Sequence, residues 1–251
     1  MHKFPYYKNL SLNKSSFFFC LVLAASYFCV WFLGKNPWQA MVPIILVGVL
    51  ALFYLRSWKL FLVYIFIAIL TSGLEILFIT YGFWAYKVDS FWSIPIYLPF
   101  VWGNIGILCV GGLKGIMMIS GQRFLHSPPR LSSALILTLL GLIALVLSVR
   151  NFAGQPFLLV LILLCIDILY VVFMRSIPLA LVGIIALTCG TIGDLTSVWL
   201  GVWNYSAISK IAGVPPYVFI GWDIMGLMIA GLYLTLDAPD APLPHWMKKN
   251  N

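Results

Sequence analysis

Long apolar segments, separated by short polar ones, dominate this chain of 251 residues. A helix that crosses a bilayer needs about 20 mainly apolar residues, and eight segments approach or exceed that length. They lie at about 16–34, 40–56, 59–83, 95–119, 132–149, 155–174, 177–201 and 216–236. Apolar and polar residues do not alternate within them, as they would in the strands of an outer-membrane barrel. The pattern therefore predicts an all-α, polytopic membrane bundle of about eight transmembrane helices.

Composition and charge agree with a membrane location. Hydrophobic residues make up 63% of the chain and charged residues 9%, whereas about 25% of the residues in an ordinary soluble protein are charged. If the chain begins in the cytoplasm, most basic residues face that side, as the positive-inside rule requires: Lys3, Lys8, Lys14, Arg56, Lys59, Arg123, Arg130, Arg175, Lys248 and Lys249. We therefore predict a multi-pass protein of a bacterial inner membrane with both termini cytoplasmic. The net charge of +8 then reflects topology and contact with membrane lipids rather than binding to nucleic acid.

The chain also repeats a motif four helices apart. A shift of 119 residues (194 − 75), which becomes 120 after one extra loop residue, superposes Glu75, Gly82, Trp84, Tyr86, Pro95, Tyr97, Trp102 and Gly106 on Asp194, Gly201, Trp203, Tyr205, Pro215, Tyr217, Trp222 and Gly226. Both copies share the pattern acid-x6-G-x-W-x-Y. Because the shift spans an even number of helices, the copies have the same orientation. This predicts two parallel four-helix repeats, 1–125 and 126–251, in one bundle.

Carboxyl groups are rare inside membrane spans and usually mark functional sites. Glu75 and Asp194 each precede the motif glycine by seven residues, which places both about 10 Å below the same end of the bundle. Asp223 falls at a similar depth, and Asp167 lies nearer the midplane, where it could hydrogen-bond a neighbouring helix. Their common depth predicts that Glu75 and Asp194 share one cleft. Glu75, Asp194 and Asp223 are the candidates for acid and base in a proton transfer.

Aromatic residues around these acids complete the candidate site. They could line a substrate pocket or simply anchor helices at the membrane interface. The candidate substrate-binding residues are Trp84, Tyr86, Tyr97, Trp102, Asn104, Trp203, Tyr205, Tyr217 and Trp222. The three histidines, His2, His126 and His245, lie in segments away from the acids, so the sequence predicts no metal site, and it predicts no other cofactor.

The repeated motif, followed by a short loop and a proline-led helix, resembles the lycopene cyclase domain and the wider set of carotenoid biosynthesis membrane proteins. The likeness covers about residues 70–110 and 189–230, and "DLTSVWLGVWNY" followed by "GVPPY" carries it best. It implies a cyclase-like isomerase or a hydratase of isoprenoid metabolism that protonates a long polyene without a cofactor. The paired acids that follow the motif proline in the cyclases do not occur after Pro95 or Pro215.

Two other classes of function stay open. The chain could be a proton-coupled carrier whose halves move about the acidic cleft. It could also be a non-enzymatic scaffold or assembly factor in which the acids pair with neighbouring helices. The expected partners are a lipophilic small molecule and membrane lipids, and the sequence leaves the substrate and the oligomeric state open.

Overall fold

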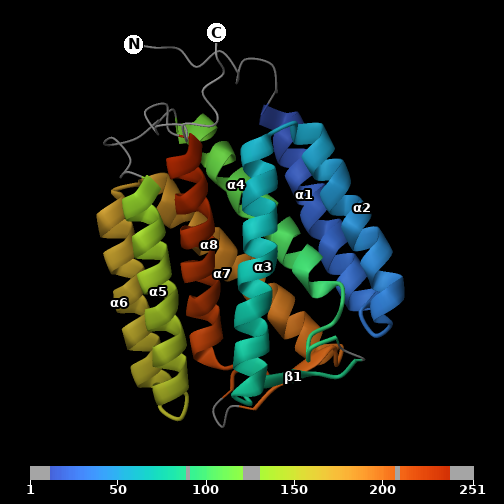
Figure 1. The fold of residues 1–251 in the computed structure, drawn as a ribbon, viewed down its shortest axis with the longest axis vertical. Coiled ribbons are helices and arrows are strands. Elements are labelled where there is room, and N and C mark those ends of the chain that lie inside the picture. Colours follow the sequence, from blue (N-terminus) through green and yellow to red (C-terminus); the bar gives the residue numbers. More distant parts are fainter. Residues whose placement is uncertain (1–11, 89–90, 121–130, 207–209, 238–251) are drawn as a thin grey trace.

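The computed structural model describes residues 12–88, 91–120, 131–206 and 210–237. Within them the chain forms one helical bundle with a two-stranded sheet at one end (Figure 1). The elements are α1 (Leu12–Phe28), the π-helical turn η2 (Cys29–Leu33), α2 (Pro37–Leu55), α3 (Trp58–Thr80), β1 (Trp84–Tyr86), α4 (Leu98–Ser120), α5 (Leu131–Phe152), α6 (Pro156–Met174), α7 (Ile177–Trp199), β2 (Trp203–Tyr205) and α8 (Pro216–Asp237).

The helices have the length and composition of membrane spans. Seven described helices, α2 to α8, are long and apolar enough to cross a bilayer. The first helix contributes a shorter apolar segment, Leu21–Leu33, which continues from α1 into η2. This confirms the prediction of a polytopic helical membrane bundle.

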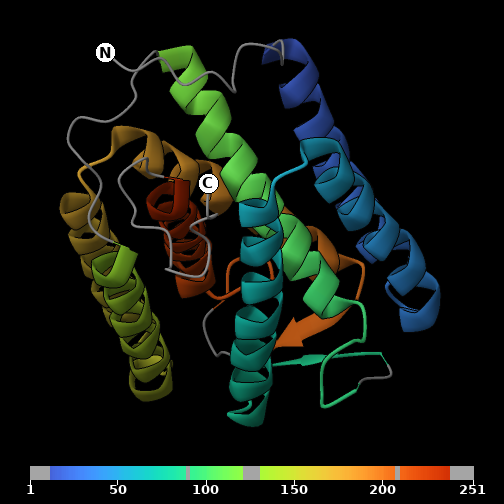
Figure 2. The ribbon, with the colours of Figure 1, turned by 45° about the horizontal axis from the view of Figure 1, so that its top comes forward.

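Helices α4 and α8 form the centre of the bundle. They contact each other; α8 also contacts α3, α5, α6 and α7, and α4 contacts α1, α2, α3 and α7. Accordingly, 72% of the α8 span is buried, against 22% for α2 and for α6. Figures 1 and 2 show α1 and α2 on one flank and α5 and α6 on the opposite flank. Large apolar side chains such as Phe53 and Phe157 are exposed on the flanks, as lipid contact requires.

The same turn connects α2 to α3 and α6 to α7. Arg56 and Arg175 end the first helix of each pair in the left-handed conformation, with φ of 47° and 49°. Ser57 and Ser176 then begin the next helix. The Oγ atom of each serine accepts a hydrogen bond from the backbone N–H group three residues further on, at 3.4 and 3.3 Å, and so satisfies a donor that the first turn of a helix leaves free.

Gly82 and Gly201 end α3 and α7 earlier than the hydrophobic pattern predicts. The apolar segments extend to about residues 83 and 201, but the helices end at Thr80 and Trp199. Gly82 and Gly201 have φ of 76° and 72°, a left-handed conformation that glycine adopts without strain and that commonly ends helices. The next N–H groups turn back to helix carbonyls five residues earlier, at 3.1 and 2.9 Å.

The residues after each glycine form β1 and β2, which hydrophobicity alone did not predict. The two strands pair antiparallel, with Trp84 opposite Tyr205, Ala85 opposite Asn204 and Tyr86 opposite Trp203. Figure 2 shows the pair lying across the end of the bundle. Helices α3 and α7 therefore both end at this sheet, so they run in the same direction.

Proline also shifts the start of α4 from the predicted position. The apolar segment begins at about residue 95, but α4 begins at Leu98. The carbonyl of Pro95 accepts a hydrogen bond from the Leu98 N–H group at 2.9 Å, which closes a turn before the helix. The carbonyl of Pro215 binds the Val218 N–H group in the same way at 3.0 Å.

Corresponding helices follow each other at a fixed spacing. Helix α6 begins and ends 119 residues after α2 (156 − 37 and 174 − 55), and α7 does the same relative to α3 (177 − 58 and 199 − 80). The predicted boundary between residues 125 and 126 and both chain ends lie outside the described residues. The division into 1–125 and 126–251 and the cytoplasmic termini therefore stay predictions.

Candidate functional site

The two strands bring the aromatic residues of both motifs together. The Trp84 and Tyr205 rings lie 5.7 Å apart between centroids, and the Tyr86 and Trp203 rings 5.6 Å apart, both edge to face. Each tryptophan therefore contacts the tyrosine of the other motif. This reciprocal contact follows from antiparallel pairing of two equal segments, and edge-to-face packing adds to the stability of the pair.

Glu75 lies on α3 below this aromatic cluster and is buried, with 8% of its surface exposed. The Trp84 indole donates a hydrogen bond from Nε1 to Oε2 of Glu75 at 2.8 Å, and the Tyr86 hydroxyl donates to the same oxygen at 3.2 Å. The tryptophan and tyrosine of the first motif thus hold the acid that precedes them. A buried carboxyl group without such donors would destabilise the fold.

Asp194 occupies the corresponding place on α7 and is 3% exposed. The Trp222 indole of α8 donates a hydrogen bond from Nε1 to Oδ2 of Asp194 at 2.6 Å. The Trp222 ring also stacks on Trp102 of α4, with centroids 5.2 Å apart and planes 25° apart. Gly190 allows this approach, because a Cβ atom there would lie 2.1 Å from the Trp222 ring.

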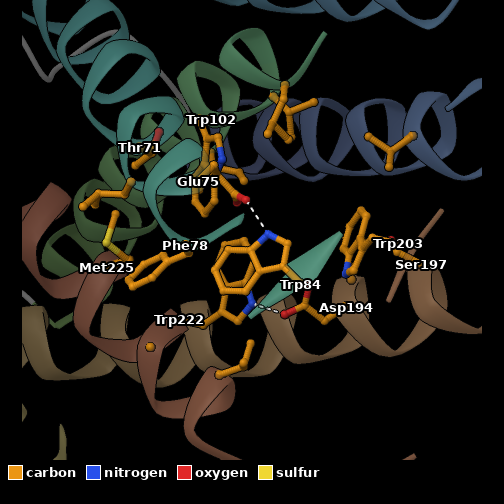
Figure 3. A pocket seen from close by; sticks show the side chains of 18 of the residues that line it. Thr71, Glu75, Phe78, Trp84, Trp102, Asp194, Ser197, Trp203, Trp222 and Met225 are labelled. Carbon is orange, nitrogen blue, oxygen red and sulfur yellow. Dashed lines mark hydrogen bonds between the residues drawn. The ribbon is translucent and has the colours of Figure 1, made fainter. Parts of the chain in front are cut away.

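Glu75 and Asp194 border the same cavity, which has a volume of about 160 Å³. Figure 3 shows both carboxyl groups with the indoles that bind them. The predicted site residues that line the cavity are Glu75, Trp84, Tyr86, Tyr97, Trp102, Asp194, Trp203, Tyr205, Tyr217 and Trp222. Among the described residues the lining contains no Lys, Arg or His. The aromatic residues of the two motifs, which follow the ends of α3 and α7, therefore also form part of the cavity wall.

Asp223 and Asn104 are not among the residues that line the cavity. Asp223 follows Trp222 directly, and successive residues of a helix point about 100° apart, so it faces a different neighbour. Its carboxyl group lies beside that of Asp167 of α6, and it packs so closely on α7 that a Cβ atom at Gly183 would lie 1.9 Å from its Oδ1 atom. Asp167 thus contacts a neighbouring helix, one of the roles considered for it.

Asn104 connects helices behind the cavity. Its side-chain nitrogen donates to Ser26 Oγ of α1 and to the Ile44 carbonyl of α2, both at 3.2 Å. The side chain is fully buried. Asn104 therefore positions Ser26, which does line the cavity, without lining the cavity itself.

Several lining residues were missed by the comparison of the two motifs. Ser26 and Tyr27 of α1 and Ser197 of α7 border the cavity. The Tyr27 hydroxyl donates to the Cys189 carbonyl of α7 at 2.8 Å. None of these three residues is identical to the residue at the corresponding position of the other half, so a comparison of the two halves for identical residues could not find them. Ser197 lies one turn after Asp194 on the same helix, and that spacing was the available signal.

Fold and cavity together define a multi-pass helical membrane protein with an internal, aromatic-lined cavity that two acids border. Among solved structures, the chain is similar to MvINS, an Insig homolog from Mycobacterium vanbaalenii, with 17% identity, a TM-score of 0.59 and coverage of 74% of this chain and 97% of that chain. It is also similar to a cross-linked trimer of MvINS, with 16% identity, a TM-score of 0.61 and the same coverage. No family model and no curated protein matches the chain.

These similarities establish the fold and overturn the suggested relationship. The matching structures are of an Insig homolog, so the assignment to the lycopene cyclase domain is wrong, and the carotenoid, isoprenoid and isomerase predictions have no support from them. The motif that suggested the cyclases has a structural cause: its glycine ends a helix, and its Trp and Tyr form a strand and cavity wall. A mycobacterial neighbour agrees with the predicted bacterial inner membrane.

Proposed function

We propose that this protein is a non-enzymatic membrane protein that binds an uncharged lipophilic small molecule and acts as a scaffold or regulator. The observation that carries the proposal is the cavity at the junction of α3, α4, α7 and α8, which all contribute to its lining. Its wall is aromatic and aliphatic apart from a few polar groups, as in most small-molecule sites.

The size and charge of the cavity restrict the ligand. An engineered apolar cavity of about 150 Å³ binds benzene, so about 160 Å³ accommodates a ring or a segment of an alkyl chain. Glu75 and Asp194 supply two acidic groups, and no basic side chain among the described lining residues would neutralise an anionic ligand. A carboxylate or phosphate group would therefore be repelled, and an uncharged ligand fits best.

The state of the two acids supports binding rather than catalysis. A general acid or base must reach its substrate within hydrogen-bond distance. Oε2 of Glu75 already accepts bonds from Trp84 and Tyr86, and Oδ2 of Asp194 accepts a short bond from Trp222. These bonds brace the wall of the cavity. A solved structure of similar fold is a cross-linked trimer, which supports a role through assembly.

The proposal can be tested by filling the cavity. Gly221 lines it, and a Cβ atom at Gly221 would have no other atom within 4 Å, so the side chain of Gly221→Leu should enter the cavity with no clash at its Cβ atom. Gly112 of α4 has equally open surroundings but does not line the cavity, so Gly112→Leu is the matched control. Both proteins are purified in nanodiscs, and the lipophilic molecules that copurify are extracted and quantified by mass spectrometry.

We expect a lipophilic species at close to one per protein in the wild type and in Gly112→Leu, and a loss of about tenfold in Gly221→Leu. The absence of any species that separates the two variants would contradict ligand binding in the cavity. Conversion of the bound species to a product on incubation would contradict the non-enzymatic part of the proposal.

A further inference from the structure

Each half of the chain contributes one acid to the cavity, so the acids alone do not fix the direction of a bound ligand. Glu75 and Asp194 correspond at the spacing of 119 residues, and so do Phe78 and Ser197 (197 − 78); all four line the cavity. A site of this kind holds an amphiphile in one direction only if its two ends differ chemically.

The carboxyl groups do not make this difference. Glu75 accepts hydrogen bonds from the Trp84 indole and the Tyr86 hydroxyl. Asp194 likewise accepts one from the Trp222 indole, and it lies beside the Tyr205 phenol. An indole and a phenol thus lie against each acid, so the distinction must come from the other side chains around them.

The end of the cavity between α1 and α7 carries two serines and Tyr27, together with the apolar Leu23 and Val30. Ser197 follows Asp194 by one helical turn, and Figure 3 shows both on the same helix. Ser26 and Tyr27 of α1 border this end, where Tyr27 bonds the α7 backbone. We call it the polar lobe, and it comprises Ser26, Tyr27, Gly193, Asp194 and Ser197.

The end between α3 and α5 is mostly apolar. Its polar side chains are Glu75 and Thr71, and the Thr71 hydroxyl already donates to the Ile67 carbonyl of its own helix. Phe78 stands where α7 has Ser197, and its ring packs on Trp84 with centroids 5.2 Å apart. Leu145 of α5 stands where α1 has Ser26 (145 − 26 is again 119). We call this end the apolar lobe, and it comprises Leu74, Phe78, Leu145 and Val149.

We propose that Ser197 fixes the direction of the bound molecule, with its polar end in the polar lobe and its hydrocarbon in the apolar lobe. This inference rests on the proposed function, since it requires a ligand in the cavity. Ser197 is fully buried and lines the cavity, and its Oγ atom has no hydrogen-bond partner among the described residues.

An unpartnered buried hydroxyl destabilises a protein, and a ligand that supplies its partner is favoured. A serine hydroxyl both donates and accepts and can rotate to suit its partner. A single neutral hydrogen bond is equivalent to a preference of about twofold to tenfold. The opposite direction would leave Ser197 without a partner and place the ligand's polar end against Phe78.

Photo-crosslinking measures the direction of binding. The probes are two forms of one long-chain alcohol, with a diazirine either beside the hydroxyl group or at the methyl end. Each is bound to the full-length protein in nanodiscs and photolysed, and the labelled peptides are mapped by mass spectrometry. In the wild type we expect the hydroxyl-end probe to label α7 near Ser197 over α3 near Phe78 by about twofold to tenfold, and the methyl-end probe to show the reverse.

Three variants test the role of Ser197. Ser197→Ala should reduce the preference of the hydroxyl-end probe to below about twofold. Ser72→Ala is the matched control, because Ser72 is also buried and unpartnered among the described residues but does not line the cavity, and it should leave the preference unchanged. The exchange Ser197→Phe with Phe78→Ser should reverse the preference.

Equal labelling of α3 and α7 by the hydroxyl-end probe in the wild type would overturn the inference but leave ligand binding intact. An unchanged preference in Ser197→Ala would also overturn it, even if the exchanged variant does not fold. Absence of labelling at every cavity residue would instead overturn the proposed function, so the two failures are distinguishable.

Discussion

The hydrogen bond between Trp222 and Asp194 should contribute measurably to the stability of the bundle. The two atoms lie 2.6 Å apart, and Asp194 is 3% exposed, so bulk solvent does not reach the carboxyl group to replace a lost donor. Hydrogen bonds to charged groups contribute about 1.5–3 kcal/mol, and an unsatisfied buried partner adds a penalty to the loss. Trp222→Phe removes the donor and keeps an aromatic ring against Trp102. Asp194→Leu removes the acceptor at similar size.

A double-mutant cycle isolates the bond from the loss of ring area. The free energy of unfolding of wild type, both single variants and the double variant is measured by SDS titration with near-ultraviolet circular dichroism. We expect a coupling energy of about 1.5–3 kcal/mol, because the second substitution no longer leaves a partner unsatisfied. Trp199→Phe is the control, since Trp199 is 82% exposed. A coupling energy below about 0.5 kcal/mol, the level at which independent sites add, would refute the reasoning.

Two further predictions concern the surroundings of the acids. Gly193→Ala should lower the free energy of unfolding by about 1–3 kcal/mol, because its Cβ atom would lie 2.5 Å from the Tyr27 ring. Gly73→Ala is the control: its Cβ atom would have no atom within 4 Å, so it should be neutral or stabilising by up to about 1 kcal/mol. Equal effects of the two substitutions in the same SDS titration would be inconsistent with this packing. Burial raises the pKa of the Tyr205 phenol well above its ordinary value, so the stability contributed by the neutral phenol is present below about pH 10 and lost as the pH rises further. In thermal unfolding from about pH 8 to about pH 11, the melting temperature of Tyr205→Phe should therefore fall less than that of the wild type. Identical pH profiles of the two proteins would disprove this prediction.

The local sequence pattern predicted the helices and indicated the hydrogen-bond partners of Glu75. Apolar segments of the required length predicted the spans, and the recurrence of an acid, a glycine, a tryptophan and a tyrosine predicted that these residues act together. In the first motif the acid does bind Trp84 and Tyr86, nine and eleven residues further along the chain. A turn of two or three residues after a helix brings such positions back to its last turns.

Contacts between distant residues were not readable from the same pattern. The sequence placed Asp223 with Glu75 and Asp194 because their depths agree, but depth does not specify which way a side chain points around the helix axis. The packing of α6 and α7 against α8 directs Asp223 to Asp167 and leaves Trp222 facing Asp194. One position along a helix thus separates a cavity residue from a helix contact.

By itself the sequence determined that the chain is a membrane bundle, where its helices run and which two acids correspond, because helix formation and insertion depend on the apolarity of consecutive residues. Only the tertiary structure decided that the two motifs meet as antiparallel strands and that both acids border one cavity. It also decided that the polar Ser197 and the apolar Phe78, which occupy corresponding positions in the two halves, both line that cavity. These features depend on the packing of segments more than one hundred residues apart, and no local pattern records which faces of those segments will meet.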